Sequence, residues 1–162
     1  MILAAVEAGM SDSASTSSGQ EWYREGLRFE CSQCGNCCTG PPGAVWFTKK
    51  EAGAMAAELG MSVADFMSTW ARKVHGNWSL KEHLTEFGWD CVFLDREASP
   101  GRAICRLYGS RPSQCRTWPF WPENLKSPEA WEEARRTTPC PGMGQGKLVP
   151  IESIRIQRDT PI

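Results

Sequence analysis

The sequence has no long apolar run and no excess of basic residues. No stretch of its 162 residues approaches the roughly 20 apolar residues that a membrane-spanning helix needs. The 18 Lys and Arg residues are balanced by 19 Asp and Glu residues, so the formal net charge is −1. Since phosphate binding needs a clear basic excess or stripe, the composition predicts neither a membrane protein nor a nucleic-acid-binding protein.

The N-terminal segment lacks the features of a secretory signal. Such a signal needs a basic region followed by an apolar stretch of about 7–15 residues. Residues 1–9 contain no Lys or Arg, and their apolar run is confined to residues 2–6. We therefore expect a cytoplasmic protein with reduced thiols, in which a dense cysteine pattern indicates metal binding or catalysis more often than crosslinking.

Recognisable catalytic patterns are also absent from the sequence. The glycine-rich residues 142–146 resemble a phosphate-binding loop, but Walker A spacing would need a glycine where Pro141 stands. We interpret His75 and His83 as ordinary core or surface residues, and no Ser–His–Asp arrangement or carboxylate pair stands out. The sequence thus favours a non-enzymatic metal-binding or redox protein.

Cysteine is what the sequence has in abundance, with eight residues in total. Four of them form the pattern C-x-x-C-x-x-C-C within eight positions, and four more follow singly. Thiolates are soft anionic ligands that suit zinc, copper(I) and iron–sulfur clusters. All eight are candidate metal ligands: Cys31, Cys34, Cys37, Cys38, Cys91, Cys105, Cys115 and Cys140. They could hold two metal ions or one multinuclear cluster.

The spacing of the first cysteines is compatible with two kinds of metal centre. Cys31-x-x-Cys34-Gly35 resembles a zinc knuckle, but tetrahedral zinc usually takes two ligands from each of two knuckles, and a second knuckle is missing. The same two cysteines together with Cys37 match the opening of bacterial [4Fe–4S] segments. A fourth ligand could come from Cys140, which precedes a proline, or from another of the later cysteines. We expect an iron–sulfur cluster of the [4Fe–4S] type or Zn²⁺, and the spacing favours the cluster.

Four arginines flank Cys105 and Cys115 in the sequence. They are Arg102, Arg106, Arg111 and Arg116. They could form a solvated face, or they could neutralise anionic thiolates, since a nearby cation favours the charged form of an acid.

Short structural elements are predicted between the cysteines. Residues 1–20 are Ser-rich and are expected to form a disordered tail, followed by a single domain over residues 21–162. Helices are expected over residues 21–27, 48–59, 62–74, 127–136 and 150–157. Strands are expected over 45–47 and 89–94, with a hairpin partner at 102–108, a helical turn within 111–120 and a loop at 140–146. These elements predict a small, irregular α+β domain organised around a cysteine-ligated metal centre.

The order of motifs resembles that of the YkgJ-type cysteine-cluster family over residues 29–146. The resemblance rests on Phe29-Glu-Cys31-x-x-Cys34-Gly-x-Cys37-Cys38, Cys91-x-Phe93-Leu94-Asp95, Gly101 with Cys105 and Tyr108, Arg111-Pro-x-x-Cys115-Arg, Pro119-Phe120 and Cys140-x-Gly142-x-Gly144. It implies a zinc- or iron-chelating domain in which all eight cysteine positions of the family are filled. A similar cluster accompanies flagellin lysine methylases, although no methyl-donor site is recognisable in this sequence.

Together these observations predict a metal-binding protein that acts in electron transfer or redox sensing, with a protein electron donor or acceptor as its partner. The alternatives are a zinc-stabilised structural or interaction module and an accessory domain of a protein-modifying, methylase-like system. We expect the four single cysteines to converge on the C-x-x-C-x-x-C-C turn. We also expect chelation, or the substitution Cys34→Ser, to unfold residues 29–146, because structural metal sites supply folding free energy directly.

Overall fold

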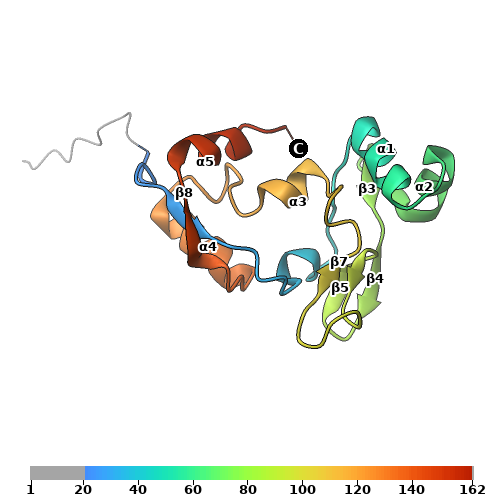
Figure 1. Cartoon of the computed structure of the whole chain (residues 1–162), viewed down its shortest axis with the longest axis horizontal. Helices are drawn as coiled ribbons and strands as arrows, with labels where there is room; N and C mark the ends of the chain where they lie inside the picture. The colour runs from blue at the N-terminus through green and yellow to red at the C-terminus, as the bar shows by residue number, and fades with distance from the viewer. Residues whose placement is uncertain (1–20, 162) are drawn as a thin grey trace, which may run out of the picture.

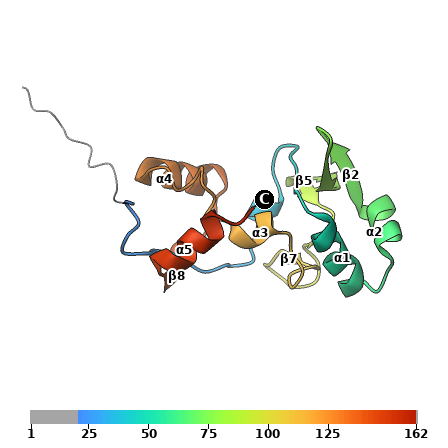
Figure 2. The same cartoon turned by 90° about the horizontal axis from the view of Figure 1, so that it is seen from above.

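The computed structural model describes residues 21–161, which form short helices and four two-stranded antiparallel sheets (Figure 1). The expected Ser-rich tail, residues 1–20, lies outside the described residues. The α+β composition of short helices and small sheets is confirmed. The elements gather in two lobes at opposite ends of the molecule, with a narrower region between them (Figures 1 and 2). No helix within residues 21–161 is long and apolar enough to cross a membrane.

One lobe is formed by residues 45–107 and is called the central lobe, because it comes from the middle of the sequence. It contains two helices and three hairpins. Its elements are α1 (Lys49–Glu58), α2 (Val63–Trp70), β2 (Ala71–Val74), β3 (Asn77–Leu80), β4 (Glu82–Thr85), β5 (Gly88–Cys91), β6 (Leu94–Asp95) and β7 (Ile104–Cys105). Each even-numbered strand pairs with the strand that follows it. The lobe packs around a core in which Met55, Phe66, Phe93 and Leu107 are almost completely buried.

Local signals set the two helices of the central lobe. Thr48 and Glu51 form the predicted capping box at the start of α1, and Ser62 caps α2. The prediction that the second helix continues to Val74 is wrong, because α2 ends at Trp70 and the chain enters β2. His75 and Gly76 both have positive φ angles, 47° and 83°, which is the conformation of a two-residue hairpin turn. The chain therefore folds back into β3.

The expected hairpin of residues 89–94 and 102–108 is only partly correct. Its β6–β7 portion pairs Leu94 with Cys105, as expected. The strand that carries Cys91 pairs instead with β4, where Cys91 faces Glu82. Residues 45–47 contribute a single bridge, between Trp46 and Ser79, rather than a strand. The two cysteines thus reach the same region from different sheets.

The other lobe is called the terminal lobe, because it combines both ends of the described chain. It contains β1 (Leu27–Phe29), α4 (Pro128–Thr137), β8 (Met143–Val149) and α5 (Ile151–Arg158). The helices expected over 127–136 and 150–157 are confirmed, and Ser127 caps α4. The helix expected over 21–27 is wrong, since a turn leads into β1 and this strand pairs with β8. The loop expected at 140–146 becomes strand from Met143 onward because β1 supplies its partner.

Two short elements lie between the lobes. They are the 3₁₀ helix η1 (Asn36–Cys38) and α3 (Ser113–Thr117), the helical turn expected after Arg111. The α3 segment is tied to the central lobe by polar contacts: the amide N–H of Ser113 donates to Glu51 over 2.6 Å, and that of Trp46 donates to Gln114 over 2.6 Å. These two elements carry Cys37, Cys38 and Cys115 into the region where the lobes meet.

Candidate metal centre

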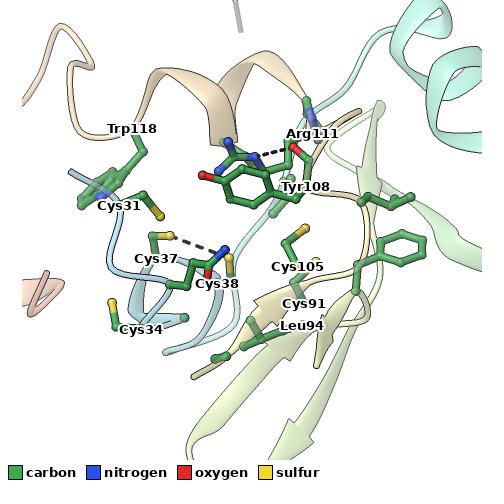
Figure 3. A pocket seen from close by; sticks show the side chains of 18 of the residues that line it. Cys31, Cys34, Cys37, Cys38, Cys91, Leu94, Cys105, Tyr108, Arg111 and Trp118 are labelled. Carbon is green, nitrogen blue, oxygen red and sulfur yellow. Dashed lines mark hydrogen bonds between the residues drawn. The ribbon is translucent and has the colours of Figure 1, made fainter. Parts of the chain in front are cut away.

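All eight cysteines line one cavity between the two lobes. Figure 3 shows the four cysteines of the turn together with Cys91 and Cys105 around it. Its volume is about 70 Å³, several times the roughly 10–15 Å³ that a single water molecule needs. The first four come from the turn after β1, and the others come from β5, β7, α3 and the loop before β8. Most of the remaining wall is apolar and includes Val45, Leu80, Phe93, Leu94 and Leu107. A soft, sulfur-rich donor set in an apolar cavity fits zinc or an iron–sulfur cluster.

The backbone of the cysteine turn packs closely against the β6–β7 region. Gly35 has a φ of +76°, and a Cβ atom there would lie 2.5 Å from the Cβ of Ala103. A non-glycine residue would therefore clash as well as be strained. The carbonyl of Gln33 accepts a hydrogen bond from the N–H of Ala103 over 2.9 Å, and that of Gly35 accepts from the N–H of Cys38 over 2.8 Å. These contacts fix the direction of the turn.

A second close approach holds the Cys140 loop beside the same turn. A Cβ atom on Gly142 would lie 2.0 Å from the carbonyl oxygen of Glu30, so this contact requires glycine. The N–H of Glu30 donates to the carbonyl of Gly142 over 3.2 Å. The side chain of Asn36 donates to the carbonyl of Pro139 over 2.6 Å. Cys140, remote in sequence, is thereby placed next to the first four cysteines.

Burial favours the neutral form of all four remote thiols. Removal from water raises the pKa of Cys91 to about 12, and it raises the pKa of Cys105, Cys115 and Cys140 as well. The indole of Trp118 lowers the pKa of Cys140, but this effect is smaller than that of burial. Because metal ligation requires thiolates, metal binding at these positions must release protons.

The adjacent cysteines of the turn behave differently. The Sγ atoms of Cys37 and Cys38 lie 3.7 Å apart, and this contact lowers the pKa of Cys37 while it raises that of Cys38. The positive charge of Arg111 also lowers the pKa of Cys37. Cys37 is thus the thiol of this pair that forms a thiolate first.

The eight side chains surround the cavity without meeting in ligand geometry. Within residues 21–161, no three His, Cys, Asp or Glu side chains lie close enough together to hold one metal ion as they stand. The structure therefore brings the eight predicted residues to one cavity, as expected for the single cysteines, and their role as ligands stays a prediction.

Of the four arginines that flank the cysteines, Arg111 is the one on the cavity wall. Its guanidinium stacks over the ring of Tyr108 at 3.7 Å from the ring centroid, and its Nε donates to the Tyr108 carbonyl over 3.0 Å. The guanidinium of Arg116 instead donates to the Ser113 hydroxyl and to the carbonyl of Arg111. Sequence reasoning missed Tyr108 as the partner of Arg111, although their spacing of three residues could have suggested it.

Comparison with known proteins agrees with the sulfur chemistry. The family model CxxCxxCC, described as a "putative zinc- or iron-chelating domain", matches residues 30–141, which confirms the resemblance drawn from the cysteine motifs. An uncharacterised protein of Methanocaldococcus jannaschii is 30% identical over 98 residues, which cover 60% of this chain and 48% of that protein. The chain thus spans about half the length of this curated relative. No solved structure matches this chain.

Proposed function

The chain belongs to the CxxCxxCC family of zinc- or iron-chelating domains, and we propose that it holds an iron–sulfur cluster for electron transfer or redox sensing. The observation that carries this proposal is the convergence of eight thiols on one apolar cavity. A [4Fe–4S] cluster takes four thiolates, and the spacing of Cys31, Cys34 and Cys37 suits three of its corners. Any of the remaining cysteines on the wall could complete the set.

The surroundings of the thiols suit a redox role. The cluster would supply a one-electron couple, and the potential of such a couple depends on net charge, hydrogen bonds to sulfur and exposure to solvent. Most of the wall is apolar, and Arg111 places one positive charge at the cavity. Cys31 and Cys37 are exposed to solvent, whereas Cys91 and Cys140 are buried. The charge of Arg111 favours the thiolate form of Cys37, Cys105 and Cys115, and it contributes to the lowered pKa of Cys37. At Cys105 and Cys115 burial outweighs the charge, so the pKa of both thiols stays raised. An electron donor or acceptor protein is the partner that this function requires.

A zinc-stabilised module is the alternative, and one feature of the turn favours it. Gly35 follows Cys34 in the left-handed conformation, as in a zinc knuckle, and directs the backbone around the sulfurs. Zinc would join the lobes without adding a redox couple. In that case the domain would act as an interaction module or as an accessory domain of a protein-modifying system.

The deciding experiment is metal and sulfide analysis of protein purified without oxygen, combined with visible spectroscopy. Iron, labile sulfide, broad visible absorption and a reversible couple in voltammetry support the cluster. A colourless protein that contains zinc and shows no reversible couple contradicts the redox role and supports the zinc module.

Arg111 and Arg116 provide a matched pair for the electrostatic part of the proposal. Arg111→Gln removes the cation on the cavity wall and should lower the midpoint potential with iron content intact, because the added electron loses a favourable charge. Arg116→Gln removes the same charge from a side chain that does not line the cavity and that contacts Ser113 and only the backbone carbonyl of Arg111, so it should change the potential much less. Equal shifts in the two variants would show that the position of Arg111 on the wall does not matter.

A further inference from the structure

One buried hydrogen-bond donor on the cavity wall has no acceptor. Trp118 follows α3, is 8% exposed and lines the cavity with Cys140. Its Nε1 atom is buried and has no hydrogen-bond partner among residues 21–161. Burial of a donor without a partner is unfavourable, so folded proteins rarely leave one in place. An unpaired indole N–H on a cavity wall therefore points to an acceptor that the cavity receives.

Two other, partly buried indoles of the terminal lobe have backbone acceptors. The Nε1 of Trp22 donates to the carbonyl of Leu125 over 2.9 Å, and that of Trp121 donates to the carbonyl of Gln114 over 2.9 Å. Trp121 packs edge-on against Trp118, with ring centroids 4.8 Å apart. Trp118 and Trp121 are thus neighbours, but only the indole N–H of Trp121 has an acceptor.

Sulfur is the acceptor that this part of the wall offers. A neutral thiol accepts hydrogen bonds weakly, whereas an anionic thiolate accepts a charge-assisted bond about twice as strong as a neutral one. Cys140 packs in the same buried cluster as Trp118. Among residues 21–161, the other two unpaired buried donors, Trp70 Nε1 and Ser110 Oγ, belong to residues that do not line the cavity. Formation of a thiolate at Cys140 would therefore pair the orphaned donor.

We propose that the Nε1–H of Trp118 donates a hydrogen bond to the metal-bound thiolate of Cys140. This inference rests on the proposed function, since it requires that a metal convert the Cys140 thiol into a thiolate. Trp118 is then a positioning residue that orients one ligand and lowers the charge on its sulfur. Partners of this kind typically affect metal affinity by about 10- to 100-fold.

The test compares Trp118→Phe with Trp121→Phe, which lose the same ring volume from neighbouring positions. Zn²⁺ affinity is measured by competition with a chelator, and cobalt(II) substitution reports the sulfur-to-metal absorption. Trp118→Phe should weaken Zn²⁺ binding by about 10- to 100-fold and shift the cobalt spectrum. Trp121→Phe removes the hydrogen bond to the Gln114 carbonyl, so it should lower the melting temperature of the metal-free protein without changing the affinity or the spectrum.

A second replacement covers the case in which Trp118→Phe does not fold. Benzothienylalanine at position 118 keeps the two-ring shape and replaces the N–H by sulfur, so it should give the same loss of affinity. Wild-type affinity and an unchanged cobalt spectrum in either variant overturn this inference alone. A wild-type protein that binds no metal overturns the proposed function, and the hydrogen bond with it.

Discussion

The two lobes differ in how the chain builds them. The central lobe is made from one continuous stretch, residues 45–107, whose sheets are hairpins between successive strands. The terminal lobe needs both ends of the described chain, because β1 pairs with β8 and Tyr23 packs among residues that follow Trp118. No buried residue of the described chain is shared between the two cores. Since local contacts form at a lower entropic cost than distant ones, the central lobe is expected to fold first.

This difference explains where the cysteines lie. The cavity takes Cys91 and Cys105 from the central lobe, Cys140 from the terminal lobe and the remaining thiols from the segments that connect them. Polar contacts such as Ser113 with Glu51 tie the connecting α3 to the central lobe. The buried cores of the two lobes, as described for residues 21–161, have no residue in common. A metal bound to thiolates from both lobes would therefore hold the lobes together in the absence of a shared apolar core.

Metal removal is the change with the largest expected effect. The metal-loaded protein should unfold in one calorimetric transition, and the chelated protein should unfold in two, because each lobe keeps its own core. For scale, structural zinc contributes about 10–16 kcal/mol in zinc-finger peptides. The sequence alone led us to expect that chelation unfolds all of residues 29–146. With two separate cores, we now expect metal removal to uncouple the lobes while each can still fold. Cys34→Ser should act like chelation, and Ser32→Ala in the same turn is the control. A single, unshifted transition after metal removal would show that the lobes are coupled without metal.

The core of the central lobe offers the next largest effect. Phe66 is completely buried, stacks on Phe93 at 6.2 Å and packs edge-on against Phe47 at 6.1 Å. Phe66→Ala should therefore destabilise the central lobe by about 3–5 kcal/mol. In the metal-free protein, the central-lobe transition should move and the terminal-lobe transition should not. Val63→Ala, on the same helix but 47% exposed, is the matched control, and calorimetry or urea unfolding measures both. An equal shift of both transitions would contradict two separate cores.

The sequence reveals the parts of this structure that local chemistry determines. Thr48 and Ser127 carry their capping partners within three residues, so the starts of α1 and α4 are predictable. The β1–β8 pairing is not, because its strands are separated by most of the chain and neither has a strong periodic pattern. Convergence of the cysteines was predictable from thiol chemistry. Their division between two lobes depends on long-range pairing, and no spacing in the sequence encodes it.

The buried ion pair of the central lobe should have a moderate effect. Asp90 is 2% exposed and accepts two hydrogen bonds from Arg96, over 2.8 and 3.1 Å. Burial raises the pKa of Asp90, but the hydrogen bonds and the positive charge of Arg96 lower it by more, so the net shift is downward. Asp90→Asn removes the charge that faces Arg96 and should cost about 1–3 kcal/mol near neutral pH.

The pH dependence of this effect follows from the direction of the shift. A lowered pKa means that the stabilisation is present above the unfolded value of about 3.9 and is lost as the pH falls through the folded value. The difference between wild type and Asp90→Asn should therefore shrink in acid, as measured by urea unfolding from pH 7 downward. Glu97→Gln, an exposed change nearby, should show no such trend. A constant difference at all pH values would exclude the Asp90 charge as its source.

The smallest expected effect lies in the terminal lobe, where Glu21 contacts Arg155 and Arg158 of α5. The hydrogen bond from Arg155, followed by those from Arg158 and Tyr23, lowers the pKa of Glu21 to about 2. The stabilisation is thus present above the usual pKa of 4.5 and disappears as the pH falls toward 2. Because these side chains are partly exposed, salt should screen the interaction.

Glu21→Gln should slightly lower the terminal-lobe melting temperature at neutral pH and low salt, with no difference near pH 2. Glu25→Gln, in a more exposed pair with Arg24, is the control. A shift of the central-lobe transition by Glu21→Gln in the metal-free protein would mean that the two lobes communicate through contacts other than the cysteine cavity.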